Sequence, residues 1–265
     1  MNIYKAEVFR YGKSFYGRMI MILVIPFAFL VAGFLHYIST GVSSEFLAAA
    51  GFSEQTIAAV KGQMGGMAYI ASAFSASELL ILLIIFPVIL HISEDYEQKA
   101  LRYELQRSTG RTGCYIARMF AAVTYAWIIL LEYIIISGII SALFFHNERN
   151  VFDIGRIMMA VVLQFMITAA CVMFVFMLAS LIRHSVLSMT TAILLVLLFT
   201  PGFRVLMDIF EQPSWSKNIW IVQLLSMTSD LTFNGTDTVL MLIGSLLYAV
   251  ISTEIGIHFF KSQKL

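Results

Sequence analysis

The chain has 265 residues, of which 60% are hydrophobic and only 12% are charged, and its mean hydropathy is +0.86. A soluble domain carries about 25% charged residues and could not bury this much apolar surface, so the composition excludes a water-soluble fold. The net charge of +1 gives no support to nucleic-acid binding, and two cysteines in or beside apolar runs argue against a disulfide framework or a cysteine-rich metal site.

The first segment, residues 1–18, alternates apolar and aromatic side chains with basic ones. This pattern predicts a helix that lies in the membrane surface, and a disordered basic tail is the alternative. The first apolar run, residues 19–37, begins only after this long polar lead. We therefore interpret it as a retained membrane span rather than a cleavable signal peptide.

Membrane spans are predicted from the lengths of the apolar runs. The hydrocarbon core is about 30 Å thick and a helix rises 1.5 Å per residue, so one crossing needs roughly 20 mostly apolar residues. Six stretches qualify, the fifth only marginally, and they are residues 19–37, 67–92, 116–145, 157–182, 186–200 and 239–260. The sequence therefore predicts an all-α polytopic membrane protein with six transmembrane helices, forming one transmembrane domain over residues 1–265.

The fifth run is short and stops at the helix-breaking pair Pro201-Gly202. An apolar but interrupted stretch follows it. Irregular backbone at membrane depth must be sheltered from lipid, because lipid offers no hydrogen-bond partner. We therefore expect residues 201–238 to be extracytoplasmic and to contain a broken or re-entrant segment that faces the bundle.

The positive charges are distributed unevenly across the predicted membrane. One side holds 12 of the 17 Lys and Arg residues, including those of residues 1–18 and of the loop at residues 93–113, and the other side holds five. Because Lys and Arg concentrate in cytoplasmic loops, this bias predicts that both termini and that loop lie in the cytoplasm. The predicted location of the chain is the plasma membrane.

The loop at residues 93–113 is the most charged segment of the chain. Ser93 and the acids after it suit the start of a helix, where the macrodipole favours negative charge, and Arg107 and Gly110 suit its end. Apolar residues recur at spacings of three and four between these ends, which predicts a short amphipathic cytoplasmic helix. The periodicity fits equally well an interfacial loop that only tethers two spans.

This loop resembles the corresponding loop of type-2 ABC exporter permeases. The resemblance rests on Glu94-Asp95-Tyr96-Glu97-Gln98-Lys99-Ala100-Leu101-Arg102, on Ser108-Thr109-Gly110-Arg111 and on Arg118. The whole chain is similar to that family in layout, and small bacterial permeases for bacitracin resistance and lantibiotic immunity are similar in size and in this loop. Where the family commonly has Gly-Thr, this chain has Lys99-Ala100.

The resemblance implies a function and a set of partners. In that family the loop helix is a coupling helix that docks in a groove of an ATPase subunit, which binds ATP and Mg, and two permeases, identical or homologous, pair in the membrane. The implied cargo is an antimicrobial peptide, a lipid-like molecule or another amphiphile that is exported. The residues implied to couple to the ATPase are Glu94, Asp95, Tyr96, Glu97, Lys99, Leu101, Arg102 and Leu105.

The sequence agrees with a nucleotide site on another chain. A Walker A motif needs Gly-x-x-x-x-Gly-Lys-Ser/Thr to wrap phosphates. The Gly-Lys-Ser at residues 12–14 has Glu7 where the first glycine belongs. We therefore predict that the chain has no catalytic site of its own and binds no metal or cofactor directly. The resemblance implies an ATPase and a second permease as partners, and the apolar spans imply membrane lipids.

Acidic residues also fall within the predicted spans. Glu78, Glu132 and Glu254 lie in the second, third and last spans, where an acid costs about 2.5 to 3.5 kcal/mol and usually faces the bundle interior. Ser75 and Glu78 share a small, polar helical face. The first interpretation of these acids is packing within the bundle. The second is that Ser75, Glu78 and Glu132 line the pathway of a cationic or amphiphilic substrate.

Two other classes of function compete with the permease. A secondary transporter coupled to protons through Glu78 and Glu132 would need no ATPase. An intramembrane enzyme would need a clustered nucleophile or metal site, but the five histidines fall near span ends, and neither His-Glu-x-x-His nor Gly-x-Ser-x-Gly occurs. The sequence therefore favours a transporter over an enzyme.

Overall fold

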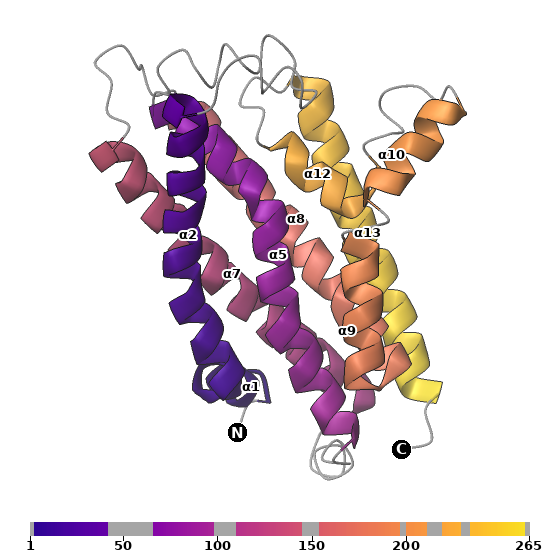
Figure 1. The fold of residues 1–265 in the computed structure, drawn as a ribbon. Coiled ribbons are helices and arrows are strands. Elements are labelled where there is room, and N and C mark those ends of the chain that lie inside the picture. The colour runs from indigo at the N-terminus through magenta and orange to yellow at the C-terminus, as the bar shows by residue number, and fades with distance from the viewer. Residues whose placement is uncertain are drawn as a thin grey trace.

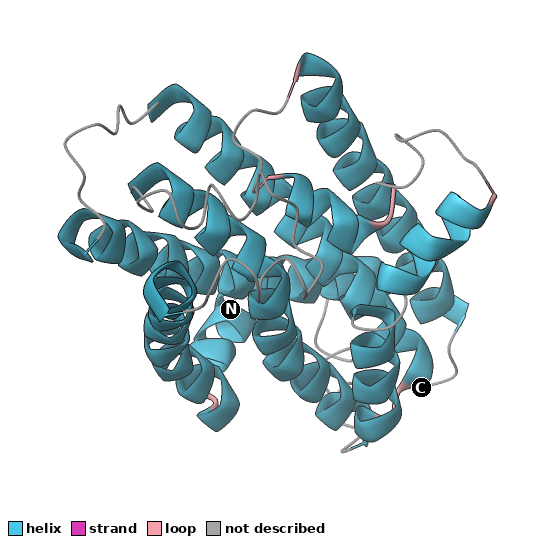
Figure 2. Ribbon diagram, turned by 45° about the horizontal axis from the view of Figure 1, so that its top comes forward, coloured by secondary structure: helices cyan, strands magenta, loops and turns pink. Residues whose placement is uncertain are grey.

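The computed structural model describes residues 3–41, 66–97, 110–144, 154–196, 200–210, 219–228 and 234–262. Within these ranges the chain forms helices and short turns and no strand, as Figure 2 shows. The helices are α1 (Ile3–Lys13), α2 (Phe15–Gly41), α5 (Gly66–Glu97), α7 (Arg111–Phe144), α8 (Ile154–Ile182), α9 (Ser185–Leu194), α10 (Thr200–Ile209), α12 (Ile221–Met227) and α13 (Gly235–Ser262). The predicted all-helical class is confirmed for this part of the chain.

Five helices are long and apolar enough to cross a membrane. They are Phe15–Tyr37, Tyr69–Glu97, Arg111–Phe144, Ile154–Ile182 and Gly235–Ser262, and each overlaps one predicted span. The remaining predicted span, residues 186–200, overlaps α9, which has ten residues and is therefore about 15 Å long, half of the hydrocarbon thickness. Five of the predicted spans are thus confirmed as helices long and apolar enough to cross a membrane, which is consistent with a polytopic helical membrane protein.

Helix α8 forms the centre of the bundle. It packs against α5, α7, α9, α12 and α13, and it is the most buried of the five long helices. Helices α2 and α13 lie at the periphery and are the least buried. Their outward faces carry large apolar side chains such as Ile22, Leu30, Leu246 and Val250. Lipid tails solvate such faces, which water would not.

The ends of the helices fall at two levels. Figure 1 shows α1, the final residues of α5 and the C-terminal end of α13 at one end of the bundle. The guanidinium of Arg111, at the start of α7, donates to the carbonyl oxygen of Lys261 near the end of α13 at 2.9 Å. Both chain ends therefore lie on the same side as the flanks of residues 98–109.

The prediction that a helix starts at Ser93 is wrong. Helix α5 continues without a break from the membrane span through Ser93 to Glu97, so the acids at 94, 95 and 97 occupy its last turn. No proline or glycine interrupts the chain here. An acid at a helix C-terminus is opposed by the macrodipole, so its charge has to be compensated from elsewhere, as Asp95 shows below.

The N-terminal segment divides earlier than predicted, at Ser14 rather than after Arg18. The Ser14 hydroxyl donates to the carbonyl oxygen of Tyr11 at 3.0 Å and accepts the Gly17 N–H at 2.9 Å. A Cβ atom at Gly17 would clash with the carbonyl oxygen of Tyr11. A glycine is needed here because the turn brings the backbone of α2 against the end of α1.

Candidate functional site

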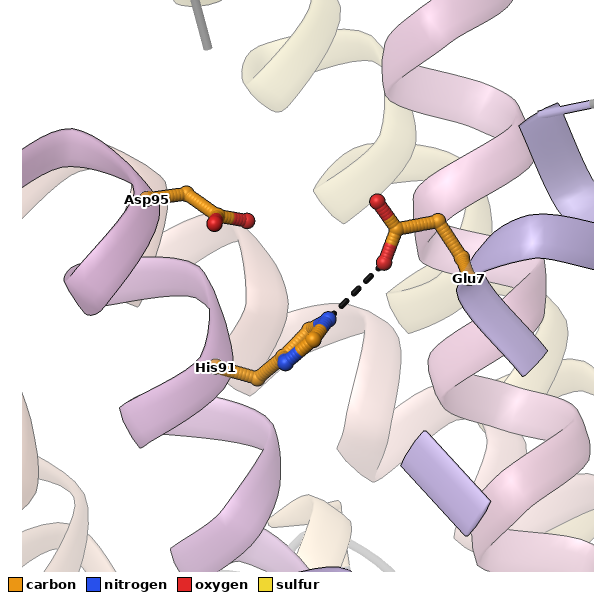
Figure 3. A group of neighbouring side chains, drawn as sticks. All are labelled: Glu7, His91 and Asp95. Carbon is orange, nitrogen blue, oxygen red and sulfur yellow. Dashed lines mark hydrogen bonds and ion pairs between the residues drawn. The ribbon is translucent and has the colours of Figure 1, made fainter. Parts of the chain in front are cut away.

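Five charged or titratable side chains from three helices meet at the end of the bundle that carries the chain ends. Glu7 and Arg10 come from α1, His91 and Asp95 from α5, and Arg118 from the second turn of α7. Figure 3 shows Glu7 facing His91 and Asp95 from the opposite helix. We call these five residues the ion-pair cluster.

Asp95 joins α5 to both α1 and α7. It is 1% exposed, and both of its carboxylate oxygens accept from the Arg10 guanidinium, at 2.5 and 3.1 Å. It also pairs with Arg118, which is 4% exposed. A guanidinium that donates to both oxygens of one carboxylate fixes the geometry of the pair and adds to its energy. These two cations compensate an acid at the C-terminal end of α5.

Glu7 makes the second set of contacts. One carboxylate oxygen lies 2.8 Å from Nε2 of His91, and the other lies 3.3 Å from Nε of Arg118 and 3.8 Å from the Arg10 guanidinium. Burial by itself raises the pKa of the Glu7 carboxyl, but the hydrogen bond from His91 and the charges of Arg118 and Arg10 outweigh it, so the pKa is lowered. Glu7 is therefore ionised at neutral pH.

Aromatic rings close the ion-pair cluster on one side. The Tyr11 ring lies against His91, with centroids 4.2 Å apart, and stacks on Tyr125 at 5.0 Å. Burial raises the pKa of the Tyr11 phenol, which keeps this ring neutral beside the charges. The Tyr125 hydroxyl donates to the carbonyl oxygen of Gly17 at 3.1 Å. These contacts fix α1 and the start of α2 against α5 and α7.

The chemistry of the cluster favours a structural role over a metal centre. Glu7, His91 and Asp95 each offer a ligand atom, and these atoms lie within 4.8 Å of one another. Both carboxylates are already compensated by Arg10 and Arg118, so a divalent cation would meet two positive charges at the same place. Two buried acids are compensated by the buried guanidinium of Arg118 and the partly exposed guanidinium of Arg10, so the arrangement balances its charge without an ion and holds three helices in one relative position.

A second link connects the end of α5 to α9. The Glu97 carboxylate accepts from the backbone N–H of Ser185 at 3.0 Å and from its hydroxyl at 2.9 Å, so it caps the start of α9. The Arg183 guanidinium lies 5.9 Å from the centre of the Tyr96 ring. Helix α9 is thereby joined to the last turn of α5, next to the start of residues 98–109.

Comparison with known proteins does not identify the chain. No model of a known protein family matches it, and no curated protein matches it either. The resemblance of the loop to the type-2 ABC exporter permeases therefore stays a prediction.

The predicted coupling residues divide into two groups. Asp95 is buried in the ion-pair cluster, Glu97 is exposed and bonded to Ser185, and Glu94 and Tyr96 are partly buried at the end of α5. The predicted coupling residues that lie outside the described part of the chain are Lys99, Leu101, Arg102 and Leu105. The four predicted coupling residues that the structure describes therefore lie in the last turn of α5, just before residues 98–109.

The predicted pathway residues lie on two of the long helices. Glu78 is partly buried on α5, and Glu132 is partly buried on α7. The backbone of Ser75 belongs to α5, and its side chain lies outside the described part. Another polar group is not predicted from the sequence. The Gln164 amide donates to the carbonyl oxygen of Phe74 and to the hydroxyls of Ser77 and Thr228, at 3.3, 3.2 and 3.1 Å.

Most of the ion-pair cluster is not predicted from the sequence. There, Glu7 is only a mismatch to a nucleotide motif and His91 is only a residue near a span end, while Arg118 belongs to the charge bias and to the family resemblance. One signal was available, because Glu7 and Tyr11 are four residues apart and share one face of α1, where an acid breaks the pattern of basic residues. That signal gives no indication of which helices the face contacts.

Proposed function

We propose that this chain is the membrane-spanning permease subunit of an ATP-driven ABC exporter. A separate ATPase subunit would bind ATP and Mg, and a second permease, identical or homologous, would complete the membrane channel. The chain would lie in the plasma membrane with both termini cytoplasmic, and its cargo would be an antimicrobial peptide, a lipid-like molecule or another amphiphile. The observation that carries the proposal is the ion-pair cluster.

The cluster supports this function because of where it lies along the chain. Asp95 comes shortly before residues 98–109 and Arg118 comes shortly after them, and the two side chains pair with each other and with α1. Because a buried ion pair joins the two flanks, we expect α5 and α7 to move together at this end of the bundle. A force applied to the loop by an ATPase would therefore move α1, α5 and α7 as one body, and the Glu97 cap would transmit it to α9.

The burial of Asp95 changes the role that the resemblance implies for it. A carboxylate that is 1% exposed and paired with two guanidiniums has no oxygen to offer a docked protein. Asp95 would therefore support coupling indirectly, by fixing the root of the loop. Direct contacts to the ATPase would come from Lys99, Leu101, Arg102 and Leu105.

The outer half of the bundle supports a sixth, broken crossing and a re-entrant segment. Helix α9 rises only part of the way across the membrane, and α10 follows at the opposite end from the chain termini (Figure 1). Helix α12 then packs against α5, α8 and α13, with Leu224 and Leu225 fully buried. The Thr228 hydroxyl accepts from the Gln164 amide and donates to the carbonyl oxygen of Leu225 at 2.7 Å, so a backbone acceptor at the end of α12 is satisfied inside the bundle, as irregular backbone in a membrane requires.

Transport by inside-out membrane vesicles tests the proposal, with bacitracin as the first probe. We expect uptake that requires ATP, stops with vanadate and continues when a protonophore collapses the pH gradient. Glu97→Gln and Arg102→Gln should reduce uptake more than they reduce ATP hydrolysis. Uptake driven by a pH gradient without ATP would contradict the proposal and would favour a proton-coupled secondary transporter that uses Glu78 and Glu132.

The candidate pathway acids are tested in the same vesicles. If Glu78 and Glu132 attract a cationic amphiphile, Glu78→Gln and Glu132→Gln should lower bacitracin uptake while ATP hydrolysis without the peptide stays normal. Glu254→Gln is the matched control, because Glu254 is an exposed acid near the C-terminal end of the peripheral helix α13. Normal uptake by both pathway variants would leave packing as the role of these acids.

A further inference from the structure

The two faces of α1 differ in chemistry. Successive residues of a helix are separated by about 100°, so Lys5, Phe9 and Lys13 fall within about 80° of one another. Glu7 and Tyr11, which are buried against α5 and α7, lie about 200° and 240° from Lys5. The side of α1 that faces away from the bundle therefore carries two lysines and an aromatic ring.

The ion-pair cluster fixes the depth of this face. Glu7 contacts His91 in the last two turns of α5 and Arg118 in the second turn of α7. The span of α2 begins at Phe15, two residues after α1 ends. Helix α1 is therefore held where the membrane spans begin, and its outward face lies at the level of the lipid headgroups.

The exposed side chains at this level combine aromatic rings and cations. Phe9 is 63% exposed and Phe15 is 69% exposed, and the ammonium group of Lys13 lies 4.7 Å from the centre of the Phe9 ring. Lys5 and Arg18 are also exposed. In the described range from Ile3 to Gly41, Glu7 is the one acid, and it is buried. Within that range the outward face thus carries positive charge and no acid.

We propose that the outward face of α1 and the start of α2, formed by Lys5, Phe9, Lys13, Phe15 and Arg18, binds the headgroups of anionic phospholipids. The aromatic rings enter the boundary between headgroups and acyl chains, and the cations contact the lipid phosphates. Since α1 is tied to α5 and α7 through buried charges, lipid binding stabilises the orientation of the whole cluster. This inference does not depend on the proposed function, because it concerns the chain and its lipids alone.

Site-directed fluorescence quenching tests the proposal in the purified chain. Gly12 lies on the same exposed face, and a Cβ atom there would meet nothing within 4 Å, so Gly12→Cys provides an attachment point for a fluorophore. The natural thiols, Cys114 and Cys171, are buried and do not compete for the label. The labelled chain is reconstituted in two mixtures of phosphatidylglycerol and phosphatidylcholine. In the first mixture only phosphatidylglycerol is dibrominated, and in the second only phosphatidylcholine is dibrominated.

We expect the relative binding constant obtained from quenching to be about fivefold or more higher for phosphatidylglycerol than for phosphatidylcholine. One cation near an anionic surface contributes about this factor. The preference should fall by at least half in Lys5→Gln/Lys13→Gln and should weaken with added salt. The matched control, Arg183→Gln/Lys261→Gln, removes the same net charge from the same side of the membrane and should keep the preference.

Three results would overturn the proposal. The first is equal quenching by the two lipids in the labelled parent chain, and the second is an equal loss of preference in the matched control. The third is a fluorophore that neither lipid quenches, which would assign this face to a protein partner. None of these results bears on whether the chain needs ATP for transport, so this test and the vesicle experiment fail independently.

Discussion

Removing the Arg118 guanidinium should destabilise the protein strongly. In Arg118→Gln, Glu7 and Asp95 stay buried but lose a cation that contacts both of them. Breaking a buried ion pair by removing one partner costs about 3 to 5 kcal/mol, because the other charge is left uncompensated. At roughly 2 to 4 °C per kcal/mol for a chain of this size class, the melting temperature should fall by about 6 to 20 °C.

Arg10 provides an internal comparison. Its side chain is 39% exposed, so water already solvates part of its charge, and exposed pairs are worth about 1 kcal/mol or less. Arg10→Gln should therefore lower the melting temperature much less than Arg118→Gln, although both residues contact the same two acids. The buried thiols of Cys114 and Cys171 report unfolding when a fluorogenic maleimide reacts with them during heating.

A double-mutant cycle separates the pair energy from other effects of the substitution. Asp95→Asn combined with Arg118→Gln should be less destabilising than the sum of the two single variants, with a coupling energy of about 0.5 to 3 kcal/mol. Equal melting temperatures for Arg10→Gln and Arg118→Gln, or strictly additive effects in the cycle, would refute the view that buried charge compensation holds the three helices together.

Three further predictions concern other contacts. Gly256→Ala should destabilise by about 1 to 3 kcal/mol in the same thermal assay, because the added methyl group would clash with the Tyr115 hydroxyl, and Tyr115→Phe should relieve part of this loss. Because the pKa of Glu7 is lowered from 4.5, its contacts contribute stability above pH 4.5, and this stability is lost as the pH falls through the lowered pKa. In Glu7→Gln, the melting temperature should therefore depend less on pH below 4.5. Gln164→Leu should cost about 0.6 to 2 kcal/mol, and it should increase proteolysis of the segment around Thr228 in reconstituted vesicles, whereas an unchanged digestion pattern would show that this amide does not hold α12.

The helical spans were predictable because they depend on local composition. A run of about 20 apolar residues has to form a helix in lipid, since no other local structure satisfies its backbone groups, and five of the predicted runs correspond to long helices. The start of a coupling helix at Ser93 was not predictable in this way. The acids after Ser93 fit a helix N-terminus by the dipole rule, but in the folded chain the cations of α1 and α7 compensate Asp95 at a helix C-terminus.

The ion-pair cluster was not predictable because its members are far apart in the sequence. Glu7 and His91 are separated by 84 positions, and Arg10 and Asp95 by 85, so only the packing of three helices brings them together. The sequence does indicate that Asp95 and Arg118 flank one charged loop. It contains no local pattern that would pair them with each other or with an N-terminal helix.

In the proposed function, an external ATPase moves this chain through residues 98–109, whose two flanks meet in the ion-pair cluster. The most direct measurement is affinity purification of the tagged chain in mild detergent from the cells that produce it, with the co-purified subunits identified by mass spectrometry and assayed for ATP hydrolysis. We predict that a nucleotide-binding subunit co-purifies in stoichiometric amount. Arg102→Gln should lower the amount of this subunit, and Lys261→Gln should leave it unchanged. An assembly that contains no nucleotide hydrolase would contradict the proposal.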